Sequence, residues 1–150
     1  MSPFGTTEPR RFIADFVTGF HAALVGGDGG DGGDCGDEEA AAIVDRFHTP
    51  DVEQIADGHR MDRAKLVAHT RPTRKRRPKL EMTVHEALTA GDRLAARYTM
   101  QVRDGKREFA IEVCFFGRFA PDGRLRRARM LTRHVPEGTR HLPDAPEAAA

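Results

Sequence analysis

The sequence predicts an α+β domain in which three helices pack in a strongly curved antiparallel sheet, a cystatin-like cone or barrel. Three observations support this class. Apolar residues in the first half recur at helical spacing, those from residue 80 onward recur at every second position, and three short connections in that second half each place a glycine beside an aspartate. A change of period from 3.6 to 2 indicates helices followed by strands. Helices gathered on one face of an antiparallel sheet define the α+β class.

Three segments have helical spacing. Residues 11–25 carry apolar side chains at offsets that fall on one helix face, residues 38–47 repeat the pattern after three acidic residues, and residues 61–69 form a shorter third helix. Pro50 and Pro72 are expected to end the second and third helices. We expect residues 1–10 to be disordered and the Gly/Asp-rich residues 26–37 to form a flexible loop.

Strands are predicted at residues 51–56, 80–88, 93–102, 107–119 and 124–134. The first is short, and the last four are joined by hairpin turns into a meander. The tail, residues 136–150, is rich in Pro, Glu and Ala and is expected to be loose. One domain at residues 11–135 accounts for all of these elements.

Composition narrows the function classes. The 150 residues include 24 basic and 23 acidic ones, and this near-zero net charge argues against neutralising phosphate backbones as the main task, so nucleic-acid binding is not expected. The N-terminal residues show no apolar stretch behind basic residues, so no signal peptide is expected, and no apolar run is long enough to cross a bilayer. Cys35 and Cys114 are expected to be reduced thiols. A cytoplasmic protein without a metal or cofactor is predicted.

Four short motifs lie on this frame. They are Phe20-His21-Ala22-Ala23-Leu24, Pro50-Asp51-Val52-Glu53 before Asp57-Gly58, Ala95-Ala96-Arg97-Tyr98-Thr99, and Phe115-Phe116-Gly117-Arg118-Phe119 followed by Asp122-Gly123-Arg124-Leu125. With the element order, they resemble the SnoaL-like polyketide-cyclase branch of the nuclear transport factor 2-like superfamily, over residues 12–135. The resemblance implies a cone with a deep apolar pocket and homodimers formed through the outer sheet face.

Alternation along the strands predicts which side chains line that pocket. On the third meander strand the uncharged set includes Val113 and Phe115, and on the last strand it includes Met130, Thr132 and His134. Phe16 and Phe20 face the pocket from the first helix. Tyr98 is expected to bind substrate through its phenol or to pack in the core.

The resemblance also places the carboxylates of related enzymes, and here they are missing or moved. Phe115 and Gln54 occupy the acid and base positions of ketosteroid isomerases. Arg97 matches the arginine of limonene-epoxide-type hydrolases, whose two aspartates are replaced by Thr99 and Met130.

Other residue types remain as candidate catalytic groups. His134 is inward by parity and carries an imidazole, a common general acid or base, or it is a solvated residue at a strand end. Glu86 shares the inward parity of its strand, unless a strand irregularity turns it outward. Arg97 could stabilise an enolate, although alternation places it on the outer face. Asp57 is a candidate base or a turn carboxylate.

Two further histidines, His59 and His69, are predicted to border the pocket. The basic run at residues 71–79 contains no aromatic residue and is expected to be a solvated loop. The predicted function is that of a small-molecule enzyme acting on an apolar, polyketide- or terpenoid-like substrate by acid/base catalysis, through cyclisation, isomerisation or dehydration. The alternatives are a non-catalytic small-molecule-binding or accessory protein with the same pocket and a nucleic-acid-associated or scaffolding protein that uses the basic run.

Overall fold

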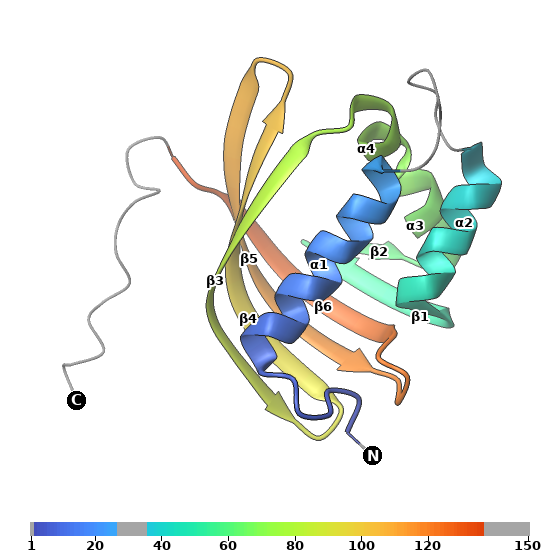
Figure 1. Cartoon of the computed structure of the whole chain (residues 1–150), viewed down its shortest axis with the longest axis vertical. Coiled ribbons are helices and arrows are strands. Elements are labelled where there is room, and N and C mark those ends of the chain that lie inside the picture. The colour runs from blue at the N-terminus through green and yellow to red at the C-terminus, as the bar shows by residue number, and fades with distance from the viewer. Residues whose placement is uncertain (1, 27–35, 137–150) are drawn as a thin grey trace.

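The computed structural model describes residues 2–26 and 36–136 (Figure 1). Within these ranges four helices and six strands follow one another as α1 (Pro9–Val25), α2 (Gly36–Phe47), β1 (His48–Ala56), β2 (His59–Met61), α3 (Arg63–His69), α4 (Arg71–Arg76), β3 (Lys79–Ala90), β4 (Arg93–Asp104), β5 (Arg107–Phe119) and β6 (Leu125–His134). The α+β class and the four meander strands are therefore confirmed. The centre of the predicted Gly/Asp loop and most of the predicted tail lie outside the described residues.

The strands form one mixed sheet in the order β2-β1-β6-β5-β4-β3. Strands β3 to β6 pair antiparallel, as the hairpin turns predict. Strand β1 pairs parallel with β6, so the predicted antiparallel sheet is extended at this edge into a mixed one. The two strands are far apart in the sequence, with β2, two helices and three meander strands between them, and β6 is the meander strand that lies beside β1. Strand β2 was not predicted, since three residues are too few to show a period.

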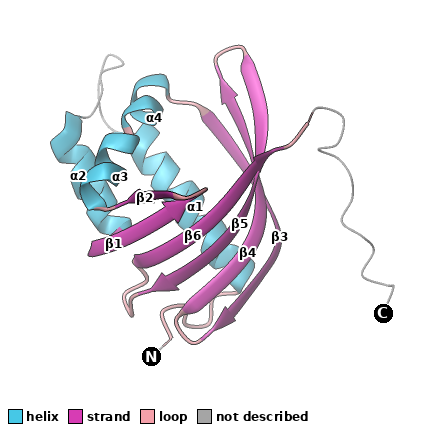
Figure 2. Ribbon diagram, turned by 180° about the vertical axis from the view of Figure 1, so that it is seen from behind, coloured by secondary structure: helices cyan, strands magenta, loops and turns pink. Residues whose placement is uncertain are grey.

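The helices lie on one face of the sheet, and α1 runs diagonally across it (Figures 1 and 2). Helix α1 begins at Pro9, whose missing N–H suits a first helical position. The prediction of a disordered N-terminus is wrong for Phe4, which is 5% exposed and packs edge-on against Phe12 and Phe119. A single phenylalanine among small residues has no periodicity, which is why the sequence did not reveal it.

The basic run is also different from the prediction. Helix α3 ends before Pro72, but a further helical stretch, α4, starts at once with that proline in its first turn. The Arg74 side chain is fully buried and donates to the Asp37 carboxylate at 2.8 Å and to the Thr70 hydroxyl at 3.0 Å. Arg71 also pairs with Asp37, and these two arginines lower the pKa of that carboxyl to about 2. The run therefore fastens the start of α2 to α4.

Candidate functional site

The inner face of the sheet, which faces α1, carries an apolar interior that is only partly closed. Its centre is a cluster of buried side chains, among them Leu94, Val113, Phe115 and Phe119. Half-buried apolar side chains from α1 and from four strands pack around this cluster, including Phe16, Val17, Met82, Val84, Met100, Ile111 and Met130. These surrounding side chains remain partly exposed, so the apolar cluster is not sealed on every side.

Two neighbouring rows of side chains cross this inner face. Strand register joins Val84, Tyr98, Val113 and Thr132 in one row. It joins Met82, Met100, Ile111 and His134 in the next. The prediction that Met130, Thr132 and His134 share the inward face is consistent with this register, because Met130 pairs with Phe115 and Thr132 with Val113. Both rows therefore end in polar side chains on β6.

Tyr98 is the polar side chain in the middle of this apolar interior. The residue is 3% exposed, and burial raises the pKa of its hydroxyl, which stays a neutral hydrogen-bond donor throughout the physiological range. In the described residues, every fully enclosed side-chain nitrogen or oxygen has a hydrogen-bond partner. The Tyr98 hydroxyl has no hydrogen-bond partner among those residues, so its oxygen is not fully enclosed and keeps some accessible surface. The hydroxyl is thus available to a guest molecule.

Asp57 is held by the end of β6. Its carboxylate accepts from the Thr132 backbone N–H at 2.8 Å and from the Thr132 hydroxyl, while its own N–H donates to the Met130 carbonyl at 3.0 Å. The Thr132 hydrogen bonds lower the pKa of the Asp57 carboxyl. Asp57 also has a positive φ of 51°, as suits a turn. These bonds match the turn-carboxylate reading of Asp57, and the lowered pKa makes it a weak base.

His134 ends the second row on β6. It is exposed, pairs with Ile111 and lies 6.0 Å from the Phe109 ring, centroid to centroid. Two strand spacings and two residues separate it from Tyr98, which corresponds to about 12 Å between the α carbons. Side chains of this length leave room for a small molecule to contact both groups.

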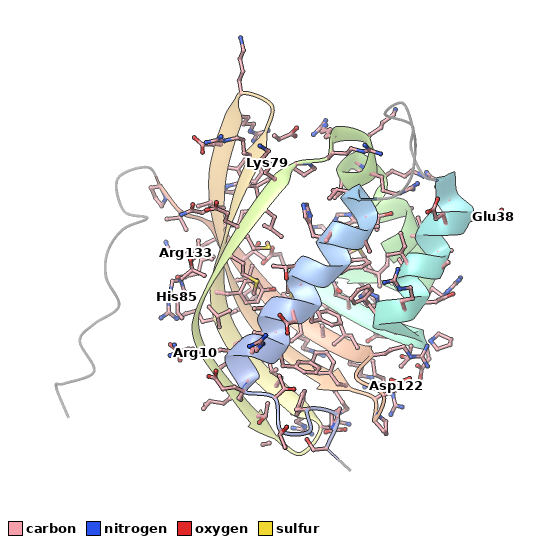
Figure 3. The ribbon with its side chains drawn as sticks, in the orientation of Figure 1. Arg10, Glu38, Lys79, His85, Asp122 and Arg133 are labelled. Atoms are coloured by element: carbon pink, nitrogen blue, oxygen red, sulfur yellow. The ribbon has the colours of Figure 1, made fainter. Side chains whose placement is uncertain are left out.

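Arg97 and Glu86 lie on the opposite, outer face, so neither can act in this interior. A β-bulge between Val84 and Glu86 adds one residue to β3, which turns Glu86 outward. Arg97 follows the alternation of β4 and pairs with Glu86 at 3.2 Å and with Glu112 at 3.3 Å. Arg133 also binds Glu112 at 2.9 Å and, with His85, lies on the side of the sheet away from α1 (Figure 3). Arg97 and Glu86 therefore form ion pairs on the outer face in place of the pocket roles predicted for them.

The remaining predicted residues divide between the core and the surface. Val113 and Phe115 are 1% and 2% exposed and form the packed floor of the interior. His59 and His69 are exposed on β2 and at the end of α3, outside the interior. Phe16 and Phe20 project from α1 toward the start of β1, where each contacts the rings of Phe47 and His48.

His48 is a buried titratable group that sequence reasoning missed. It is 2% exposed, and its Nδ1 donates to the Val44 carbonyl at 2.9 Å, since a carbonyl can only accept. Burial lowers the pKa of the imidazole. In the sequence, His48 stands directly after an apolar helix and two residues before Pro50, at the point where β1 begins. That position next to an apolar segment was the signal for its burial. His48 is thus a neutral ring among phenylalanines.

The sequence matches the SnoaL-like domain over residues 35–128, which is more than half of the chain. The chain belongs to the SnoaL-like family. The matched stretch includes Tyr98 and ends six residues before His134. The resemblance drawn from the four motifs is therefore confirmed, and with it the place of this SnoaL-like domain in the nuclear transport factor 2-like superfamily.

Solved structures share the fold of this SnoaL-like chain at low identity. An epoxide hydrolase of M. tuberculosis, similar to limonene-epoxide hydrolase, is 18% identical with a TM-score of 0.56, covering 82% of this chain and 84% of its own. IdmH from Streptomyces antibioticus, a proposed polyketide cyclase, is 16% identical with a TM-score of 0.53, covering 79% and 90%. A proposed isomerase from Rhodopseudomonas palustris is 16% identical with a TM-score of 0.59, covering 85% and 91%. No curated protein matches the sequence.

Such likeness establishes the fold and leaves the activity to the site itself. Within residues 2–26 and 36–136, no three His, Cys, Asp or Glu side chains gather as metal ligands would. In the same part of the chain, no helix has the length and apolar character that crossing a membrane requires. The groups available for chemistry in this SnoaL-like domain are therefore the buried Tyr98 phenol, the His134 imidazole at the end of β6 and the apolar side chains around Tyr98.

Proposed function

We propose that this SnoaL-like protein binds a largely apolar, carbonyl-bearing small molecule against the inner face of its sheet and catalyses proton transfer on it. The observation that carries the proposal is the Tyr98 hydroxyl, a neutral donor in an apolar surrounding with no partner among the described residues. An unpaired buried hydroxyl costs roughly 1–3 kcal/mol of stability, and a ligand oxygen would recover that cost. Polyketide- and terpenoid-like ketones have the required chemistry.

In the proposed reaction, Tyr98 donates a hydrogen bond to the substrate carbonyl oxygen. His134 removes a proton from the carbon next to that carbonyl, and the electron pair of the broken C–H bond moves onto the oxygen as an enolate. The Tyr98 hydrogen bond strengthens as that charge develops. Return of the proton to another atom gives isomerisation, attack of the enolate on a second carbonyl gives cyclisation, and loss of a β-hydroxyl gives dehydration.

Hydrogen–deuterium exchange tests this step without knowledge of the natural substrate. The acetyl protons of 2-acetylnaphthalene exchange slowly with D2O, and we expect the protein to accelerate that exchange. His134→Gln should reduce the acceleration by about 100-fold, the lower end of general-base effects. His69→Gln, another exposed histidine, is the matched control and should retain full acceleration. Equal rates for wild type and His134→Gln would contradict the assignment.

A non-catalytic binding protein is the second candidate, and one observation favours it. Glu86 and Arg97 pair with each other on the outer face, and Asp57 is held by Thr132, so neither candidate carboxylate is placed to serve the interior as a base. This candidate predicts that 2-acetylnaphthalene binds without accelerated exchange. The same experiment therefore separates the two functions.

We also propose a cytoplasmic homodimer, as the family resemblance implies. The free thiol of Cys114 suits a reducing compartment. Light scattering during size-exclusion chromatography measures the oligomeric state, and a monomer at all accessible concentrations would contradict the dimer.

A further inference from the structure

The inner face of the sheet continues past the rows of Tyr98 and His134 into a third apolar row and then a charged pair. Strand register joins three half-buried apolar side chains in this third row, Leu80, Val102 and Phe109. One step farther, next to the hairpin turn, Asp104 of β4 pairs with Arg107 of β5. Alternate residues of a strand share one face, so Arg107 lies on the inner face with Phe109. The apolar wall therefore ends in charged groups.

Arg107 is a cation that is held in place without being neutralised. Its guanidinium carbon lies over the Phe109 ring, 5.0 Å from the ring centroid, in a cation–π contact. Asp104 stands opposite, but its carboxylate is 3.5 Å from Arg76 of α4, which lies at the same end of the sheet (Figure 1). Within residues 2–26 and 36–136, Arg107 makes no ion pair with a carboxylate. Two arginines thus meet one aspartate here, and one positive charge is left without a counterion.

The three polar groups of the inner face follow one another along the sheet. Tyr98 pairs with Val113, and Phe109 lies four residues from Val113 on β5, which corresponds to about 13 Å. His134 belongs to the row between these two, and its ring is 6.0 Å from the ring of Phe109. The order is therefore phenol, imidazole, guanidinium. A molecule of two fused rings with oxygens at its opposite ends has the length to contact the first and the last.

We propose that Arg107 binds a carboxylate of the substrate, so that the guest of this protein is a keto acid with an apolar body between its two polar ends. The planar guanidinium presents parallel N–H donors that match the two oxygens of a carboxylate. Arg107 is exposed, so the anion remains partly hydrated and avoids the cost of burying a charge.

This inference rests on the proposed function, because the ketone of the same molecule is the group that Tyr98 contacts. It adds the feature by which the substrate is selected and turned, with its carboxylate beside Arg107 and its reacting carbon near His134. Arg107 lies on the inner face, so a homodimer formed through the outer face leaves it accessible.

A ligand pair that differs only in charge tests the role of Arg107. 6-Acetyl-2-naphthoate and its methyl ester share the rings and the ketone. By calorimetry at physiological ionic strength, the wild type should bind the acid about ten-fold more tightly than the ester. Arg107→Gln should bind the two with equal affinity. The control Lys106→Gln removes the same charge from the turn of the same hairpin, and it should keep the wild-type preference.

Two kinds of failure are distinguishable in this experiment. Equal affinity of the wild type for acid and ester, or a preference that survives in Arg107→Gln, would overturn the role of Arg107 and leave the proposed function intact, because the ketone still binds. An acid that shifts the Phe109 amide in NMR but moves no methyl signal of Met82 or Met100 makes only a surface ion contact, which would also overturn it. Absence of binding by acid, ester and 2-acetylnaphthalene alike would overturn the proposed function and this inference together.

Discussion

Removing the Tyr98 hydroxyl should have opposite effects on stability and on binding. Tyr98→Phe keeps the ring that packs between Val84 and Val113 and deletes only the oxygen. An unpaired buried hydroxyl costs roughly 1–3 kcal/mol, and because this oxygen keeps some accessible surface we expect the low end of that range. The free energy of unfolding should therefore rise by up to about 1 kcal/mol, which for 150 residues raises Tm by about 3 °C.

Affinity for a ketone should move the other way in the same variant. A neutral hydrogen bond contributes about 1 kcal/mol, so Tyr98→Phe should weaken the binding of 2-acetylnaphthalene about five-fold. Urea unfolding measures the first effect and calorimetry the second. Tyr98→Leu, which removes the ring, should lose stability through a cavity and serves as the control for packing. Destabilisation of Tyr98→Phe by 1 kcal/mol or more would refute the reasoning, since it would mean that the hydroxyl is satisfied within the fold.

Three further variants test the surroundings of the site. His48 has a native pKa below its unfolded value of 6.5, so the unfolded state binds more protons than the native state as pH falls through 6.5. The free energy of unfolding of the wild type should therefore decrease over this range, by at most about 1.4 kcal/mol per pH unit. Urea unfolding should show a smaller decrease in His48→Gln. Arg74→Met should destabilise the protein by about 1–3 kcal/mol in thermal unfolding, because the buried charge-assisted hydrogen bonds of Arg74 are lost. Arg71 binds the same carboxylate, but its side chain is more than half exposed. The control Arg71→Met should therefore cost less than half as much. Gly117→Ala places a methyl group 2.5 Å from the Phe115 ring and should lower the free energy of unfolding by about 1–3 kcal/mol. The double variant Gly117→Ala/Phe115→Leu should recover part of that loss. Equal stability of Gly117→Ala and the wild type would exclude the clash.

Long periodic segments of this chain were predictable from sequence, and single contacts were not. The meander strands and α1 each show many repeats of their period, so their type and bounds follow from the pattern within a few residues. The parallel pairing of β1 with β6 joins segments separated by the entire meander, and nothing local in either strand specifies it. The burial of Phe4 and Arg74 depends on partners elsewhere in the chain, Phe119 and Asp37.

The candidate site shows the same division. Alternation correctly placed Arg97 on the outer face against the family alignment, because β4 is regular throughout. The same rule failed for Glu86, since one bulge reverses the facing of every residue beyond it. Sequence parity identified Tyr98 as an inward phenol, but its lack of a partner could be seen only when the neighbouring strands were in place.

The central claim, that a guest occupies the interior beside Tyr98, is tested most directly by methionine-methyl NMR. Met82, Met100 and Met130 all belong to the half-buried wall of the interior and report on its occupancy. Titration with 2-acetylnaphthalene should shift these three methyl signals saturably. The carbonyl-free 2-ethylnaphthalene should bind about five-fold more weakly, a preference that disappears in Tyr98→Phe. Methyl signals that stay unmoved at saturating ketone, or equal affinity of the two naphthalenes for the wild type, would contradict the account.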